Sequence, residues 1–217
     1  DPNMVSPITY GDLFKQAEQE YSRWNFDISD PELPEKKPLP VIATIFAAPT
    51  IFGAAVICGL DDAMFAMNIP LFMMENGFTK KMGLQFITIA TVGGIVTQPL
   101  IGILLDKLEK RLLMNTAVLI VFVSPILFAL NLDSFLIMII SCFIWGGAVS
   151  SLFAISLTML GERYNASQVA GATAILVMIF ESGSALGPFI AGPAMDIFGS
   201  FGLIYTICSL TFLFLIV

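Results

Sequence analysis

The chain has 217 residues, of which 57% are hydrophobic and 12% are charged, and its mean hydropathy is +0.87. Soluble domains carry about twice that share of charged residues, so the composition excludes a soluble protein and indicates an integral membrane protein. The net charge of −7 comes without a basic cluster and excludes a nucleic-acid partner. The absence of histidine removes the commonest metal ligand and the usual general base near neutral pH.

Residues 1–40 are polar, acidic and rich in proline, and we expect them to form a cytoplasmic tail or a central linker. The chain starts without Met and stops inside an apolar run, so we expect it to be a fragment of a longer protein. Residues 41–217 are predicted to form one transmembrane bundle, because each apolar segment is close to or above the roughly 20 residues that span a bilayer. The six segments are 43–73, 83–105, 111–130, 135–161, 167–195 and 200–217.

Basic residues and cysteines constrain the topology and the chemistry further. Lys and Arg gather in the tail and around the loop at 106–111, and basic residues favour the cytoplasmic side, so both should be cytoplasmic. Cys58, Cys142 and Cys208 stand alone in apolar segments, which predicts neither a disulfide framework nor a metal site. No Walker-type nucleotide loop is present, and we expect no cofactor.

An internal similarity predicts the symmetry of the bundle. The stretch PLIGILLDKLE near the end of the second segment aligns with FIAGPAMDIFG in the fifth, so that Gly102 matches Gly192 and Asp106 matches Asp196. Three segments separate the copies, and an odd number of crossings places them on opposite membrane faces. We therefore expect an all-α membrane protein, a six-helix bundle built from two inverted three-helix repeats, as is typical of secondary transporters.

The stretch GILLDKLEKR resembles the loop motif of the major facilitator superfamily, in which charges hold a cytoplasmic gate closed in one conformation. Glu109 departs from the motif where the family usually has glycine. The resemblance implies a gating role for this loop, and an ordinary charged loop is the alternative. The matching residues are Gly102, Asp106, Lys107, Lys110 and Arg111.

The stretch GSALGPFIAGP resembles the antiporter motif of the same family, through Gly183, Gly187, Pro188 and Gly192. Small residues four apart let helices approach closely and proline bends a helix, so these residues would shape the helix without binding substrate. Packing alone is the alternative. The connection at 160–174 is also similar to that family.

Six helices are half of such a transporter. The fourth segment lacks the intramembrane Arg that is usual in the N-terminal half of this family, so the resemblance implies the C-terminal half. A second six-helix bundle is then expected as a partner, either the missing half of the same chain or a second subunit.

Two adjacent carboxylates, Asp61 and Asp62, lie inside the first segment. An ionised group in hydrocarbon costs at least about 2.5 kcal/mol, so a carboxylate there usually faces a cavity or a partner. Neighbouring residues diverge by about 100° around a helix, so we expect one aspartate to line a cavity while the other packs or reaches interfacial water. Asp61 and Asn68 share a face and predict a polar stripe, which favours Asp61. The alternative places both carboxylates near the headgroups.

Glu181 lies midway along the fifth segment, and no Lys or Arg lies in the interior of the six segments. Desolvation favours the protonated form of a carboxyl group, which is the property that proton coupling requires. A structural hydrogen-bond donor is the alternative role. Gln98 and Trp145 are further candidates for lining a cavity, although for Trp145 packing or a place in the aromatic belt facing lipid is favoured.

The leading hypothesis is a multi-pass membrane protein that transports a small molecule by alternating access, coupled to protons, and that is not an enzyme. An aspartyl protease is rejected because neighbouring aspartates cannot face each other as a dyad. A transport-inactive receptor or scaffold stays open as the alternative. The expected partners are a small-molecule substrate, protons, the lipid bilayer and the second bundle, with no metal and no nucleic acid.

Overall fold

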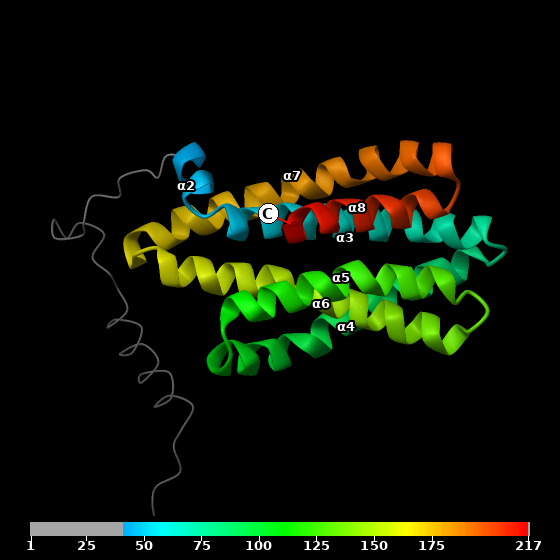
Figure 1. Cartoon of the computed structure of the whole chain (residues 1–217), viewed down its shortest axis with the longest axis horizontal. Coiled ribbons are helices and arrows are strands. Elements are labelled where there is room, and N and C mark those ends of the chain that lie inside the picture. Colours follow the sequence, from blue (N-terminus) through cyan, green and yellow to red (C-terminus); the bar gives the residue numbers. More distant parts are fainter. Residues whose placement is uncertain (1–40, 217) are drawn as a thin grey trace, which may run out of the picture. The chain divides into compact units, whose positions relative to one another are not determined.

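The computed structural model describes residues 41–216, without the side chains at 166 and 167. Within that range every element is a helix, which confirms the predicted all-α bundle (Figure 1). The elements are α2 (Val41–Ala47), α3 (Pro49–Glu75), α4 (Lys80–Lys107), α5 (Lys110–Leu130), α6 (Phe135–Arg163), α7 (Ala166–Phe198) and α8 (Phe201–Ile216). The predicted tail at 1–40 lies outside the described residues.

Five of these helices, α3 to α7, are long and apolar enough to cross a membrane, and α8 is apolar but has only 16 residues. The prediction of one unbroken first segment from residue 43 is wrong, because α2 ends at Ala47 and α3 begins at Pro49. Ala48, between them, has φ −139° and ψ 61°. A proline disfavours the helical conformation of the residue before it and is well placed at the first position of a helix, so the chain breaks here.

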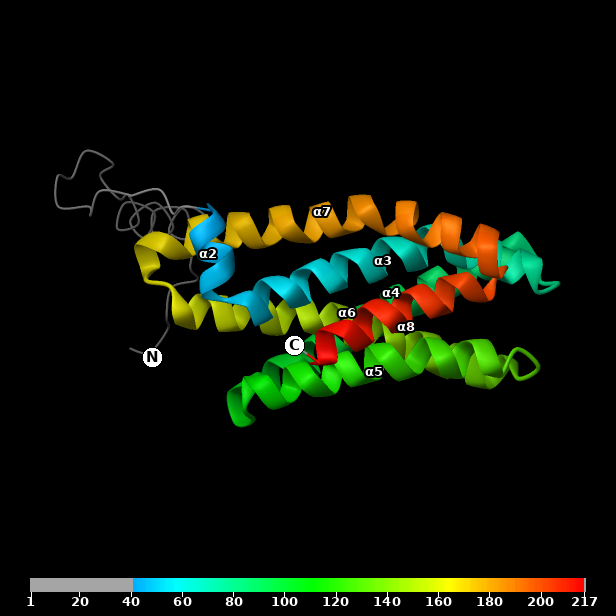
Figure 2. The same cartoon turned by 45° about the horizontal axis from the view of Figure 1, so that its top comes forward.

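Two helix pairs make the most extensive contacts in the bundle, since α3 packs along α7 and α4 packs along α6 (Figures 1 and 2). Glycines allow both contacts. A β-carbon on Gly59 of α3 would overlap the Phe180 carbonyl group of α7, and one on Gly146 of α6 would overlap the Ala90 carbonyl group of α4. We name these the α3–α7 and α4–α6 crossings.

The two crossings are related by constant shifts in residue number. From Gly59 of α3 to Gly146 of α6 the shift is 87 residues, and from Ala90 of α4 to Phe180 of α7 it is 90 residues. A second contact of each crossing obeys the same shifts, because Gly183 meets the Val56 carbonyl and Gly93 meets the Phe143 carbonyl. The alignment of Gly102 with Gly192 also has a shift of 90 residues. These contacts agree with the predicted pair of three-helix repeats.

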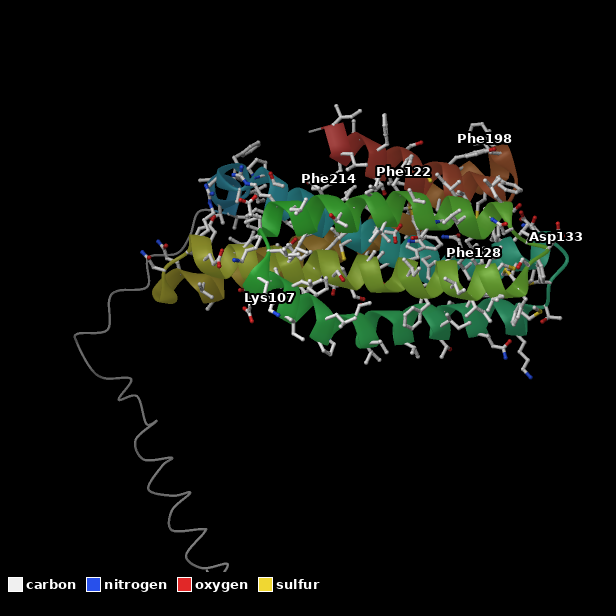
Figure 3. The ribbon with its side chains drawn as sticks, turned by 60° about the horizontal axis from the view of Figure 1, so that its bottom comes forward. Lys107, Phe122, Phe128, Asp133, Phe198 and Phe214 are labelled. Atoms are coloured by element: carbon white, nitrogen blue, oxygen red, sulfur yellow. The ribbon has the colours of Figure 1, made fainter. Side chains whose placement is uncertain are left out.

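Aromatic side chains fill the bundle interior towards one end. Phe86 and Phe128 meet edge to face with ring centroids 5.2 Å apart, and Phe72 packs on Phe128 at 5.9 Å. Aromatic pairs of this geometry stabilise a core beyond the burial of their area. Phe128 lies towards the end marked by Asp133, whereas Lys107 lies at the other end (Figure 3).

The end that contains Lys107 is tied together by charged side chains. Lys110 of α5 pairs with Glu162 of α6, with 2.7 Å between Nζ and Oε1. Arg163 donates a hydrogen bond to the carbonyl oxygen of Ala47, which connects α6 to α2. The loop between α4 and α5 and the end of α6 are therefore joined at this end of the bundle.

Candidate functional site

A cavity of about 450 Å³ lies between α3, α4 and α6, and we name it the carboxylate cavity. Its volume is in the range of roughly 300 to 1,000 Å³ that is typical of small-molecule sites. Both acidic and aromatic side chains line it, together with hydroxyl and amide groups. The polar and aromatic lining residues are Asp61, Asp62, Phe65, Thr91, Gln98, Trp145 and Ser150.

Asp61 is buried within the bundle, with 2% of its surface exposed. The indole Nε1 of Trp145 donates a hydrogen bond to its Oδ2 at 2.9 Å, so α6 fixes the orientation of a carboxylate on α3. The other oxygen, Oδ1, is buried and has no hydrogen-bond partner among the described residues. Leaving such a group unpaired costs about 1 to 3 kcal/mol or more, so packing alone does not explain an acid at this position.

Asp62 is exposed and lines the same cavity. Both aspartates line the carboxylate cavity, but their surroundings differ. The divergence of neighbouring side chains directs Asp61 to Trp145 of α6, whereas the exposed Asp62 interacts electrostatically with Glu181 of α7.

Glu181 is exposed on α7, so this bundle alone does not desolvate it. The one ion pair within 4.0 Å in residues 41–216 joins Lys110 to Glu162. No basic side chain of the described part therefore neutralises Asp61, Asp62 or Glu181.

Asn68 does not extend the site. It is 8% exposed, it is not in the lining of the carboxylate cavity, and its Nδ2 donates to the Met64 carbonyl of its own helix at 3.0 Å. Of the two residues of the predicted polar stripe, Asp61 therefore lines the cavity and Asn68 does not. Gln98, by contrast, is exposed and lines it.

A larger cavity, of about 940 Å³, lies between α3, α5 and α8. Its walls are mostly apolar, and Arg111 and Arg163, its charged residues, lie near the helix ends. The buried, half-paired carboxylate is not in its lining. The carboxylate cavity is therefore the better candidate for a site that recognises a ligand.

A family model described as the Major Facilitator Superfamily matches residues 51–217, which is most of the chain. The chain belongs to the Major Facilitator Superfamily. It is therefore a multi-pass membrane transporter, and the resemblance drawn from the sequence motifs is confirmed.

The antiporter-type motif of this superfamily member lies at the α3–α7 crossing. A β-carbon on Gly183 would lie 2.6 Å from the Val56 carbonyl oxygen, and one on Gly187 would lie 2.7 Å from that of Leu60. Both glycines therefore hold α7 against the turn of α3 that carries the carboxylates. A β-carbon on Gly192 would meet nothing within 4 Å, and α7 continues as one helix through Pro188.

The loop motif contributes contacts at the end of the bundle. Asp106 and Lys107 are exposed in the last turn of α4, and a β-carbon on Gly102 would meet nothing within 4 Å. Lys110 pairs with Glu162, and Arg111 lines the larger cavity.

The hydrogen bond from Trp145 to Asp61 is the feature of the site that the sequence did not reveal. Only 1% of Trp145 is exposed, so it does not lie in an aromatic belt facing lipid; it packs in the interior and lines the carboxylate cavity. Its ring meets Phe65 edge to face, with 4.6 Å between centroids. The sequence contained a clue to this bond. A buried carboxylate requires a hydrogen-bond donor, and Trp145 is the one tryptophan in residues 41–217.

Proposed function

We propose that this chain is one six-helix half of a secondary active transporter, and that it moves a small molecule by alternating access through the carboxylate cavity. The observation that carries the proposal is the state of Asp61, which is buried, bonded by Trp145 through one oxygen and unpaired at the other. A packed structural carboxylate would have both oxygens satisfied. An acid that packing does not explain, in the lining of a cavity, supports a role in transport.

The exposure of α4 and α7 supports a second six-helix bundle as the partner. In the most apolar stretch of each helix, 17% of residues are buried for α4 and 28% for α7, against 50% or more for α3, α5 and α6. Glu181 and Gln98 lie exposed on these two helices. An ionised side chain facing lipid costs about 2.5 to 3.5 kcal/mol, so we assign the face of α4 and α7 to contact with the second bundle.

Proton coupling is proposed for the carboxylates around the cavity. Asp61 interacts electrostatically with Asp62 and with the thiols of Cys58 and Cys208, and Glu181 interacts electrostatically with Asp62. No basic group of the described part faces these acids. Taking up or releasing one proton therefore changes the net charge of the site without compensation, which suits a group that couples substrate movement to protons.

The end of the bundle with Lys107, Lys110 and Arg111 is assigned to the cytoplasmic side, because basic residues concentrate there. The tail at 1–40 would then be a cytoplasmic linker to the second bundle. Cysteine labelling from either side of the membrane tests this topology. Labels introduced near Lys107 and near Asp133 are expected to react from opposite sides.

Transport itself is tested by reconstituting the chain together with its second six-helix bundle in liposomes and measuring uptake of a labelled solute panel with and without an imposed proton gradient. Gradient-dependent uptake of at least one solute supports the proposal. Uptake that ignores the gradient contradicts proton coupling, and the absence of flux for every solute would favour the receptor or scaffold alternative.

A further inference from the structure

We propose that the larger cavity, between α3, α5 and α8, binds one anionic phospholipid of the leaflet on the Lys107 side. An acyl chain would lie in the apolar part of the cavity, and the phosphate would lie at Arg111 and Arg163. The cavity shares no lining residue with the carboxylate cavity, so the inference does not rest on the transport proposed above.

The polar side chains of the lining lie at one end of the larger cavity. Arg111 and Asn115 are in the first two turns of α5, Thr50 is in the first turn of α3, and Arg163 is the last residue of α6. Both charged residues of the lining are cations. The cavity therefore has a basic end at the membrane surface and an apolar part that extends into the bundle.

The apolar part has the depth of about one leaflet. The lining runs along α3 from Pro49 to Leu60, a rise of about 16 Å at about 1.5 Å per residue. Half of the roughly 30 Å hydrocarbon core of a bilayer is about 15 Å. An acyl chain whose phosphate lies at the basic end therefore fits the depth of the cavity. The apolar residues that would contact it are Val56, Ile57, Leu60, Val118 and Leu210.

Exposed residues of α8 open the cavity to the bilayer. Leu213 and Ile216 line it and are 62% and 67% exposed, whereas Ile57 and Met114 line it and are buried. The walls of an unfilled apolar space lose their dispersion contacts, and lipid chains surround the exposed apolar residues of a membrane helix. An acyl chain is therefore the occupant that the surroundings of this cavity supply.

The two arginines keep donors available for a phosphate. Arg163 donates a hydrogen bond to the carbonyl oxygen of Ala47, but a guanidinium has five N–H donors. Arg111 forms no ion pair within 4.0 Å among residues 41–216. A guanidinium binds a phosphate through two parallel hydrogen bonds, and basic pockets between membrane helices bind anionic headgroups.

An open space of about 650 Å³ adjoins the basic end and gives room for the headgroup, because it shares Arg111 and Arg163 with the larger cavity. Its acids are Glu109 and Glu162, and Glu162 is already paired with Lys110. Cations therefore exceed acids around the headgroup position, which favours a lipid with a net negative charge over a zwitterionic one.

The test uses the full chain in nanodiscs and two photoactivatable lipids, phosphatidylglycerol and phosphatidylcholine, that carry the same diazirine-labelled acyl chain. Mass spectrometry identifies the labelled residues after illumination. We expect phosphatidylglycerol to label residues 49–60 and 111–118 at least about threefold more than phosphatidylcholine. Both lipids should label residues 123–130, towards the other end of α5, to the same extent.

Equal labelling of the cavity by the two lipids would indicate unselective contact with the bilayer and would overturn the inference. The absence of labelling in the cavity by either lipid would show that protein fills the space, and it would overturn the inference as well.

Variants then assign the preference to the arginines. Arg111→Gln should lower the ratio of labelling by the two lipids at least about twofold, and the addition of Arg163→Gln should bring that ratio close to one. Lys81→Gln, an exposed cation at the opposite end, is the matched control and should leave the ratio unchanged.

Arg163→Gln also removes the bond to Ala47, so if the double variant does not fold, Arg111→Gln alone decides. An unchanged ratio in Arg111→Gln, or an equal fall in Lys81→Gln, would overturn the inference.

Discussion

The α3–α7 and α4–α6 crossings have the same close glycine contacts between main chains but differ in charge. The shift of 87 residues that relates α3 to α6 places Ala148 and Val149 at the positions equivalent to Asp61 and Asp62. The shift of 90 residues from α4 to α7 likewise pairs Thr91 with Glu181. The α4–α6 crossing therefore forms with neutral side chains where the α3–α7 crossing carries three acids.

This difference indicates that the acids are not required for packing. Glycines bring the helices together in both crossings, and Ala148 and Val149 are buried with 6% and 7% exposed. Burying an acid destabilises a fold unless the group is fully satisfied, so the buried Asp61, present at only one of two equivalent crossings, is explained by function rather than by stability.

The largest effect on stability is expected from placing a side chain where a glycine meets the facing helix at each crossing. Gly59→Val and Gly146→Val should each lower the free energy of unfolding by about 3 kcal/mol or more, because the new side chain overlaps a backbone carbonyl group of the facing helix. The yield of monodisperse protein and thermal unfolding in detergent measure this.

Gly161→Ala is the control, since a β-carbon there meets nothing within 4 Å, and it should be neutral or slightly stabilising. Normal folding of either valine variant would contradict the equivalence of the crossings.

Replacing the carboxyl group of the buried acid by an amide should separate function from stability. Asp61→Asn is expected to lower substrate uptake at least about tenfold, while thermal stability stays nearly the same because the amide oxygen still accepts the hydrogen bond of Trp145. Uptake and unfolding are measured on the same preparation. Asp133→Asn should change neither, and full uptake by the Asp61→Asn protein would refute the role given to this carboxylate.

A change at Glu181 should alter coupling without altering folding. Glu181→Gln is expected to abolish the stimulation of uptake by a proton gradient, because the amide cannot exchange a proton and its equivalent position in the other crossing is the neutral Thr91. Uptake is compared with and without the gradient. A response to the gradient equal to that of the unaltered protein would assign proton coupling elsewhere.

The smallest change in stability is expected at the charged end. The carboxylate of Glu162 and the ammonium of Lys110 are partly exposed, and such ion pairs contribute about 0 to 1 kcal/mol. Lys110→Gln should therefore leave unfolding almost unchanged but alter the rate of uptake at least about twofold, if the loop controls a gate. Lys81→Gln, exposed at the opposite end, should alter neither, and an unaltered uptake rate in Lys110→Gln would contradict the gating proposal.

Structural features that recur along the chain could be predicted from the sequence. Long apolar runs located the helices, and the alignment of Gly102 with Gly192 carried the same shift of 90 residues that the crossings show. The break at Ala48 was missed, although Pro49 supplies a local reason for it.

Contacts between distant residues could not be predicted in the same way. The bond from Trp145 to Asp61 spans 84 residues and leaves no periodic pattern in the sequence. Helical spacing placed Asn68 and Asp61 on one face, but it could not tell that Asn68 bonds its own helix outside the cavity. Which side of a helix meets which neighbour is decided by packing in three dimensions.

The glycine crossings also constrain how the molecule can move. Carbonyl groups of the facing helices occupy the space beside Gly59 and Gly146, so neither pair can slide without a steric clash between main chains. We therefore expect the six helices to tilt together as one rigid body. The hinge and the opening towards each side of the membrane would then lie along the boundary with the second six-helix bundle.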